Sequence, residues 1–321
     1  MRVRAAGPPG RMPRMPEQPH AIRPPRPVSP QSVPLRSASP PSLPPRSLPP
    51  RSVLDAFGLR GTPEPLTGGQ GRSVRVGGAV LKPAEGTEGE SEWAASVFER
   101  LPRGAGFRVP RPLRSAGGDC VVDGWTAAAF MAGRPGPRGR WPEVVAVGRA
   151  LHAALREQPR PGFLDRRTHP WAVADRVAWG EEEADVVAEL AEPLSLLLSL
   201  RQPVEAAAQI VHGDLAGNVL FAPGQDPVVI DFSPYWRPPL YAEAVVIADG
   251  LLWYEPAPSL LTGGGEDPRW RQMLIRALIF RLVALSGLVD PSWRAGEQES
   301  TRFLAATEAV RRGPDGGWTR P

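Results

Sequence analysis

The hydrophobic positions in the first part of the chain come in short runs separated by glycine and proline. Two runs flank a glycine-rich turn within 65–76, and further runs lie at 79–82, 120–122 and 125–131. Short apolar runs bounded by such residues are typical of β-strands joined by tight turns. One segment, at about 91–101, follows an acidic stretch of the kind favoured at the start of a helix. The pattern predicts an antiparallel sheet with one helix over residues 52–132.

Beyond residue 133 the apolar positions recur at helical spacing instead. Within 142–158, for example, Val147, Leu151 and Leu155 are separated by four residues each, which places them on one face of a helix. The same reasoning predicts helices over 171–180, 182–201, 239–255, 267–286 and 296–312. We therefore expect an α+β fold, with the small antiparallel sheet in one lobe and a larger, mainly helical lobe over 133–321.

The helical pattern is interrupted by a short β-hairpin within residues 209–233. Two apolar runs, 219–221 and 228–230, flank a turn that contains Pro-Gly and Asp-Pro. Three polar residues stand at the ends of these runs, namely Asp214, Asn218 and Asp231. A rigid hairpin presents such side chains at one point, as functional loops on a fixed scaffold do.

The polar residues of this hairpin have the spacing of a kinase catalytic loop. The pattern His-x-Asp-x-x-x-x-Asn runs from His212 to Asn218, and an apolar run then ends at Asp231. In phosphoryl transfer one carboxylate orients the attacking hydroxyl, while an amide oxygen and a second carboxylate hold Mg²⁺ against the nucleotide phosphates. We assign the first role to Asp214 and the metal to Asn218 and Asp231. We expect His212 to brace the loop through hydrogen bonds.

Two residue types that occur once in the chain both coincide with this chemistry. Lys82 is the only lysine among 38 basic Lys and Arg residues, and Asn218 is the only asparagine. Lysine is a compact point charge on a flexible stem, whereas arginine is a rigid fork, so the two do not substitute for each other. The rarity of Lys82 favours a specific role, and we expect it to reach the α- and β-phosphates of a nucleotide.

The turn before Lys82 is a candidate phosphate-binding loop. Its glycines allow backbone N–H groups to approach phosphates closely. We expect the loop 68–73 to cover the nucleotide through Gly68, Gly69, Gly71 and Ser73. A glycine-rich hairpin alone is a weak signal, and it gains weight from the strand that ends at Lys82.

The motifs His212-Gly213-Asp214 and Ile230-Asp231-Phe232-Ser233 resemble those of the aminoglycoside phosphotransferase and choline kinase superfamily. Protein kinases usually carry Arg where this chain has Gly213, and Gly where it has Ser233. No Ala-Pro-Glu follows, so the sequence lacks the mark of an activation segment. The resemblance implies a two-lobed protein-kinase-like fold that uses ATP and Mg²⁺ to phosphorylate a hydroxyl of a small molecule.

The resemblance also implies further nucleotide-binding residues. An acid on the helix at 91–101 should pair with Lys82, and we favour Glu92, with Glu88 and Glu90 as alternatives. The segment 130–133 resembles the hinge between lobes, where Phe130 and Ala132 would contact adenine. The same side chains are also expected from ordinary core packing. The acceptor substrate and the choice between ATP and GTP stay open.

The basic character of the chain belongs to its N-terminal tail. Residues 1–51 hold nine Arg and one acid, Glu17, a net charge of +8, whereas the whole chain is +4, which leaves 52–321 at −4. We therefore expect no nucleic-acid partner for the folded part. The tail also holds 16 of the 41 prolines, a composition that predicts disorder or an upstream extension. The alternative is a ligand for a proline-recognition partner.

Two further features bear on the compartment and on alternative functions. One cysteine, Cys120, excludes a disulfide framework, and no apolar run is long enough to span a membrane, so we expect a cytoplasmic protein. The acidic run 181–185 indicates either a charge cluster at a helix start or a wall for a cationic substrate. A non-catalytic, kinase-shaped scaffold is the rival function, and the intact set of Lys82, Asp214, Asn218 and Asp231 argues against it.

Overall fold

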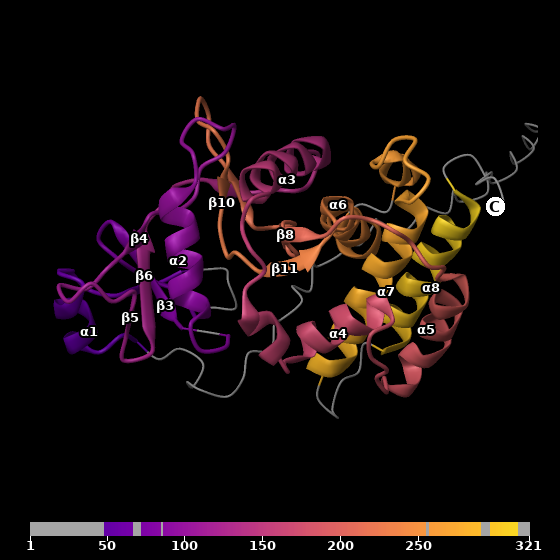
Figure 1. Cartoon of the computed structure of the whole chain (residues 1–321), viewed down its shortest axis with the longest axis horizontal. Helices are drawn as coiled ribbons and strands as arrows, with labels where there is room; N and C mark the ends of the chain where they lie inside the picture. Colours follow the sequence, from indigo (N-terminus) through magenta and orange to yellow (C-terminus); the bar gives the residue numbers. More distant parts are fainter. Residues whose placement is uncertain (1–47, 67–71, 85, 255–256, 290–295, 314–321) are drawn as a thin grey trace, which may run out of the picture. The chain divides into compact units, whose positions relative to one another are not determined.

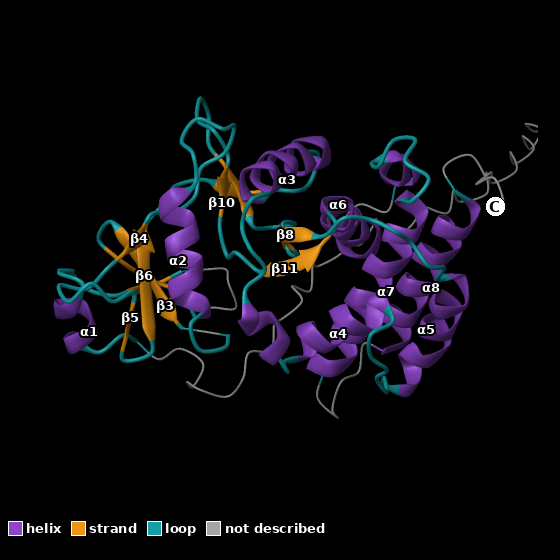
Figure 2. Ribbon diagram, in the orientation of Figure 1, coloured by secondary structure: helices purple, strands orange, loops and turns teal. Residues whose placement is uncertain are grey.

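The chain begins with a small antiparallel sheet and continues as a mainly helical region (Figures 1 and 2). The structure is a computed structural model that describes residues 48–66, 72–84, 86–254, 257–289 and 296–313. The predicted tail up to residue 47 and the loop glycines Gly68, Gly69 and Gly71 lie outside these ranges. The α+β class predicted from the hydrophobic pattern is confirmed.

The first sheet has the strand order β1-β2-β3-β6-β4, and β5 also pairs with β6. Its members are β1 (Glu64–Pro65), β2 (Val74–Val76), β3 (Ala79–Pro83), β4 (Pro112–Leu113), β5 (Val121–Val122) and β6 (Trp125–Ala129). Alternate residues of β2, β3 and β6 point to one face, where Val76, Leu81 and Trp125 are buried. This face packs on α1 (Arg51–Ala56) through Val53 and Leu54. The short alternating runs in the sequence thus bury one side of each strand.

The helical region is built around α7 (Trp270–Leu288). Its other helices are α3 (Trp141–Leu155), α4 (Pro170–Trp179), α5 (Ala188–Leu200), α6 (Pro239–Asp249) and α8 (Gly296–Arg312), with short 3₁₀ turns at Gly162–Arg166 and Pro258–Thr262. Helices α4, α5, α6 and α8 all pack against α7, and Figure 1 shows α4, α5 and α8 beside it. Helix α2 (Glu90–Arg100) belongs to the first lobe.

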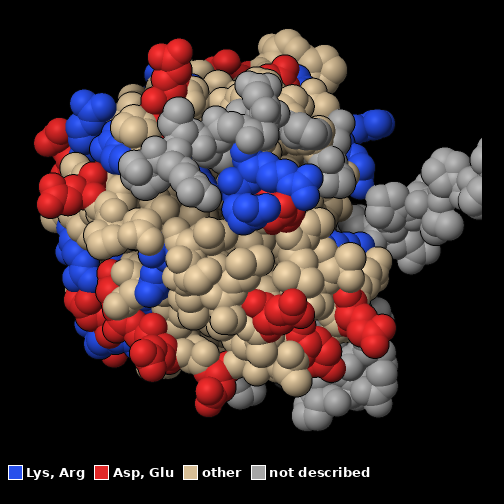
Figure 3. Space-filling model, turned by 90° about the vertical axis from the view of Figure 1, so that its right-hand side faces the viewer, with Lys and Arg blue, Asp and Glu red and all other residues tan. Residues whose placement is uncertain are grey.

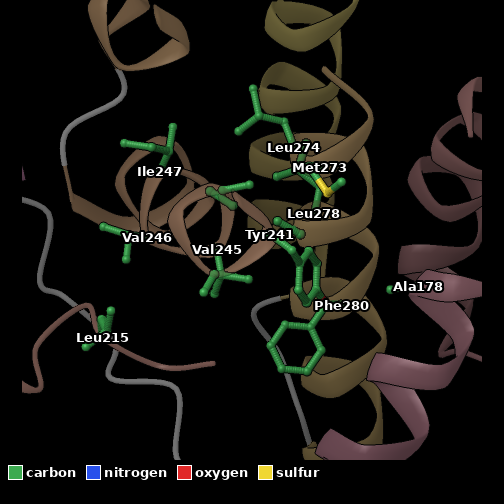
Figure 4. Packing of buried hydrophobic residues seen from close by; sticks show 14 of the residues in the cluster. Ala178, Leu215, Tyr241, Val245, Val246, Ile247, Met273, Leu274, Leu278 and Phe280 are labelled. Atoms are coloured by element: carbon green, nitrogen blue, oxygen red, sulfur yellow. The ribbon is translucent and has the colours of Figure 1, made fainter. Parts of the chain in front are cut away.

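The burial of α7 follows from its sequence, in which the residues of 273–284 are apolar apart from Arg276 and Arg281. A helix of this kind lies inside a protein rather than on its surface. Figure 4 shows Tyr241 of α6 lying beside the α7 side chains Leu278 and Phe280. The Tyr241 ring lies 6.3 Å from the Phe280 ring across the same contact. The contact between α6 and α7 is therefore a continuous part of the main core.

Two small antiparallel sheets carry the predicted catalytic loop. Strand β8 (Gln209–His212) pairs with β11 (Pro234–Arg237), in the register that sets His212 opposite Pro234. Strand β9 (Val219–Phe221) pairs with both β10 (Val228–Val229) and β7 (Arg134–Pro135). The predicted hairpin of 219–221 with 228–230 is therefore present. The pairing of β8 with β11 had no clear signal in the sequence, because its strands are short and 21 residues separate their ends.

Two helix boundaries differ from the predictions by several residues. Helix α5 begins at Ala188 rather than at 182, and α6 ends at Asp249, where a π-helix, Gly250–Tyr254, continues it. Consequently the acidic run 181–185 follows the end of α4 and does not start a helix. Within that run Glu181 pairs with Arg237, and Glu182 pairs with Arg176. These two carboxylates neutralise arginines of the same chain.

The surface carries charges of both signs. On the face drawn in Figure 3, acidic and basic side chains are interspersed with uncharged surface. Within the part of the chain that the structure describes, no helix combines the length and the hydrophobicity needed to cross a lipid bilayer.

Candidate active site

His212 ties the catalytic loop to the strand that precedes Asp231. Its side chain is fully buried, and its Nδ1 accepts a hydrogen bond from the backbone N–H of Asp214 at 3.1 Å. Because Nδ1 accepts, Nε2 carries the proton and donates to the carbonyl of Ile230 at 3.2 Å. Burial lowers the pKa of His212, which keeps the ring neutral. The geometry is that of a brace between two parts of the loop.

A second histidine supports His212 from α3. The backbone N–H of His212 donates to Nε2 of His152 at 3.1 Å, and His152 is itself buried. Burial lowers the pKa of His152 to about 3. This ring therefore stays neutral and acts as an acceptor in the core.

Asn218 is oriented by Asp214. Its Nδ2 donates to the backbone carbonyl of Asp214 at 2.7 Å and to Asp214 Oδ2 at 3.1 Å. Both contacts use the amide nitrogen, so the amide oxygen stays available as a ligand. The backbone carbonyl of Asn218 accepts from the N–H of Ile230 at 2.9 Å. This bond places Asn218 across the hairpin from the residue before Asp231.

Lys82 reaches Asp231 from the first sheet. Lys82 lies on β3, and its Nζ is 2.7 Å from Asp231 Oδ1. The charge of Lys82 lowers the pKa of Asp231, so this carboxyl group is ionised. Asp231 also has a positive φ of 48°, a conformation that is uncommon for residues other than glycine. The structure therefore brings together the sole lysine and the predicted metal ligand.

The predicted pairing of Lys82 with Glu92 is wrong in this structure. Glu92 instead forms an ion pair with Arg114 at 2.8 Å and bonds with Cys120, contacts that lower the pKa of its carboxyl group. The error lies in the helical geometry. Val97, which is buried on the inner face of α2, is five residues beyond Glu92, so the two side chains point about 140° apart around the helix. Glu92 shares its face with Glu99, which also pairs with Arg114.

Glu90, one of the alternatives, occupies the inner face of α2. It shares this face with Trp93 and Val97, at helical spacings of three and seven residues. Its carboxylate is held by Arg167, which is 5% exposed and also donates to the carbonyl of Pro234 at 2.5 Å. The inner acid of α2 is therefore tied to the strand that follows the predicted metal ligand.

The remaining predicted nucleotide contacts are only partly described. Phe130 follows β6 directly, and the guanidinium of Arg75 covers its ring at 3.9 Å. Ala132 is exposed in the segment that joins β6 to β7. Ser73 accepts from the N–H of Leu66 at 2.9 Å, which pairs the two ends of the glycine-rich loop. The loop glycines themselves lie outside the described residues.

Two residues near Asp214 had no signal of a role in the sequence. Arg281 of α7 contacts Asp214 Oδ1 at 2.7 Å, and it also pairs with Asp249 at 2.6 Å. Asp249 is one of two acids on α6, the helix that follows β11. The other, Glu243, pairs with Arg149 at 2.6 Å. The contact between Arg281 and Asp214 spans 67 residues, so neither spacing nor composition could have revealed it.

These residues fit a nucleotide-bound Mg²⁺. Asp231 supplies an ionised carboxylate and Asn218 an amide oxygen, which are the oxygen donors that Mg²⁺ prefers. Magnesium usually takes one or two protein carboxylates and completes its octahedron with phosphate oxygens and water. Asp214 stands beside Asn218, with a side chain that is 44% exposed. The arrangement can therefore place a hydroxyl group next to a metal-bound phosphate.

Comparison with known proteins identifies the same architecture. The model of the phosphotransferase enzyme family matches residues 66–287. The structure is similar to that of a thermostable mutant of the aminoglycoside phosphotransferase APH(4)-Ia in a ternary complex with ADP and hygromycin B. The two are 19% identical with a TM-score of 0.54, over 81% of this chain and 97% of that chain. The comparison with curated proteins finds no match.

Two further solved structures show the same likeness. An aminoglycoside phosphotransferase from Alicyclobacillus acidocaldarius is 15% identical, with a TM-score of 0.53, over 83% of this chain and 94% of that one. A microcompartment-associated aminopropanol kinase is 16% identical, with a TM-score of 0.53, over 81% and 95%. The two-lobed kinase-like fold predicted from the sequence is therefore confirmed.

Proposed function

This chain belongs to the phosphotransferase enzyme family, and we propose that it uses ATP and Mg²⁺ to phosphorylate a hydroxyl group of a small molecule. The observation that carries the proposal is the contact of Lys82 with Asp231, 2.7 Å long, between the first sheet and the catalytic hairpin. A cation and an ionised carboxylate at this point are what a nucleotide triphosphate and its metal ion require.

The proposed roles follow from the contacts of each side chain. Asp231 and the amide oxygen of Asn218 would hold Mg²⁺, which supplies neutralisation of charge on the transferring phosphoryl group. Lys82 would leave Asp231 to donate to the α- and β-phosphates. Asp214 would accept the proton of the acceptor hydroxyl, with its carboxylate fixed by Asn218 on one side. Most of the rate acceleration would come from positioning and from charge.

His212 has a supporting role in this scheme. It is buried, neutral and fully occupied by Asp214 N–H and the carbonyl of Ile230. A ring with both nitrogens engaged has no site for a substrate proton. His212 therefore keeps Asp214 and Asp231 in register, as the sequence pattern predicts.

The acceptor belongs to the class of small molecules with a free hydroxyl group. The solved relatives carry aminoglycoside and aminopropanol in their printed names, so these compounds are the first acceptors to assay. Consumption of ATP is measured with each acceptor in turn, and the phosphorylated product is identified by mass spectrometry.

The proposal is tested by Asp214→Ala. We expect this variant to bind MgATP within a few-fold of the wild type and to lose phosphoryl transfer by roughly 10²-fold or more, the usual effect of removing a positioned general base. Asp226→Ala is the matched control, because Asp226 is an exposed residue in the turn of the same hairpin. Equal turnover by the wild type and Asp214→Ala would reject the proposed role.

A further inference from the structure

Arg281 is a buried cation that contacts two carboxylates, one structural and one in the candidate active site. Its side chain is 1% exposed, and its Nε and Nη2 donate to the two oxygens of Asp249 at 2.6 Å each. Nη2 also donates to Asp214 Oδ1 at 2.7 Å. A lone buried guanidinium is costly, and a bidentate carboxylate is the arrangement that offsets this cost best. Asp249 alone meets that need, so the bond to Asp214 calls for a separate explanation.

The contact with Arg281 completes the fixation of Asp214. Arg281 donates to Oδ1 of this carboxylate, while Asn218 donates to Oδ2 at 3.1 Å. Two donors on different oxygens set both the position and the plane of a carboxylate. Asp214 is nevertheless 44% exposed, so its remaining lone pairs are open to an incoming hydroxyl. A carboxylate that is fixed yet accessible suits a step in which reacting atoms must be aligned.

The anchor of Arg281 lies within the main hydrophobic core. Arg281 follows Phe280 on α7, and Asp249 is the last residue of α6. The two helices meet along the core contact of Figure 4, where Tyr241 lies beside Phe280. Arg281 also lies 5.3 Å from the Trp171 ring of α4. Because the guanidinium of Arg281 is held among three helices, we expect it to move little. Its hydrogen bond should therefore restrain the carboxylate of Asp214, which lies on an exposed loop.

We propose that Arg281, held by Asp249, is a positioning residue that fixes the carboxylate of Asp214 for phosphoryl transfer. The inference rests on the proposed function, because it concerns the step assigned there to Asp214. Arg281 does not touch substrate in this scheme. It acts through Asp214, and Asp249 acts through Arg281 by fixing the guanidinium and offsetting its charge.

The test is Arg281→Lys, with Arg276→Lys as its matched control. Lysine keeps the charge but lacks the fork that bridges two carboxylates. Arg276 lies on the same helix, is 4% exposed, and bonds to Gln272 and to the carbonyl of Gln202 rather than to Asp214. We expect Arg281→Lys to lower kcat by roughly 10²-fold, the scale of a 1 Å misplacement in an active site. The KM for ATP should change less than about twofold in both variants, and kcat of the control should stay within about twofold.

Asp249→Asn provides a second, milder variant. Asparagine can still accept one hydrogen bond from Arg281, but it removes the charge that balances the guanidinium. We expect kcat to fall by less than in Arg281→Lys, with the KM for ATP unchanged. Melting temperatures of all variants are measured in parallel. A merely structural role predicts that kcat of folded Arg281→Lys equals kcat of folded Arg276→Lys, and that result overturns the proposal.

A spectroscopic measurement separates this inference from the proposed function. The ¹³C signal of the Asp214 carboxylate is assigned by its loss in Asp214→Ala, and it requires no turnover. We expect it to shift in Arg281→Lys and to stay in place in Arg276→Lys. If Asp214→Ala is as active as the wild type, the proposed function fails. If Asp214→Ala is inactive while Arg281→Lys has normal kcat and an unshifted signal, the positioning role fails alone.

Discussion

Lys82 Nζ lies 2.7 Å from Asp231 Oδ1, so the only lysine of the chain contacts the carboxylate proposed to hold the metal. The ammonium group of Lys82 thereby lies where Asp231 would bind a metal ion, and the carboxylate of Asp231 lies where Lys82 would bind phosphate. In the proposed reaction Asp231 would bind Mg²⁺ and Lys82 would bind the nucleotide phosphates. These two interactions would replace the ion pair that Lys82 and Asp231 form with each other in this structure. Binding of MgATP is therefore expected to break the ion pair between Lys82 and Asp231.

This relationship predicts different effects for the two partners. Asp231→Ala should abolish the Mg²⁺-dependent part of ATP binding, because it removes the metal carboxylate. Lys82→Ala should weaken ATP binding with and without Mg²⁺, because the phosphates lose their cation. Calorimetric titration with ATP, in Mg²⁺ and in EDTA, measures both effects. Unchanged MgATP affinity in Asp231→Ala contradicts the metal assignment.

Two of the acids of α2, Glu90 and Glu92, are expected to differ in their contribution to stability. Glu90 is 15% exposed and pairs with Arg167, which is 5% exposed. Glu90→Ala would leave the buried charge of Arg167 unpaired, so it should lower the free energy of unfolding by about 3 kcal/mol. Glu92 is 50% exposed beside Arg114, so Glu92→Ala should cost under about 1 kcal/mol. Urea unfolding of both variants gives the two values. Equal losses would show that Arg167 does not depend on Glu90.

The lowered pKa of His152 predicts that the protein loses stability in mild acid. Its pKa is about 3 in the folded protein against an ordinary value of 6.5. Between these values the unfolded chain binds the extra proton, so the free energy of unfolding falls as pH drops below 6.5. The full effect on the free energy of unfolding is on the order of 5 kcal/mol. In His152→Gln, whose amide oxygen can still accept from His212 N–H, we expect a smaller loss between pH 6.5 and 4.5, measured by urea unfolding.

The boundary of the tail predicts different results for two truncations. Pro49 is buried, and the carbonyl of Pro50 accepts from the N–H groups of Val53 and Leu54 at the start of α1. Deletion of residues 1–47 should leave the melting temperature unchanged, as the composition of the tail implies. Deletion of residues 1–50 should lower it by a few degrees, because an apolar contact and a helix acceptor are lost. Calorimetry of both truncations checks this, and a large decrease for the shorter deletion contradicts it.

The sequence predicts the parts of the site that depend on local spacing. Asp214 and Asn218 are four residues apart, and a short hairpin carries Asp231 back to them. Their proximity therefore needs only strand propensity and a turn. The uniqueness of Lys82 selects it among many basic residues without knowledge of the fold.

The acid on the inner face of α2 is harder to predict, because its identity depends on the rotation of the helix. Glu90 and Glu92 differ by two residues, hence by about 200° around α2. Choosing between them requires the face that Trp93 and Val97 bury. A check of the angles among these residues would have favoured Glu90 as the inner acid, although its partner, Arg167, would still have been missed.

The contact between Arg281 and Asp214 lies beyond the reach of sequence patterns. In the sequence Arg281 is one of three arginines within a mainly apolar helix, and nothing local distinguishes it from Arg271 or Arg276. Only the packing of α6 on α7 brings it to the catalytic loop. Long-range contacts of this kind are set by tertiary structure, which a single sequence does not encode in any local signal.

Gly213 has a consequence for the charge beside the catalytic loop. A Cβ atom at this position would lie 2.4 Å from the ring of Tyr235, so no side chain fits there while Tyr235 is present. An arginine directly before Asp214 in the sequence is therefore excluded unless Tyr235 is replaced at the same time. The packing of Gly213 on Tyr235 thereby keeps the position next to the proposed catalytic aspartate uncharged.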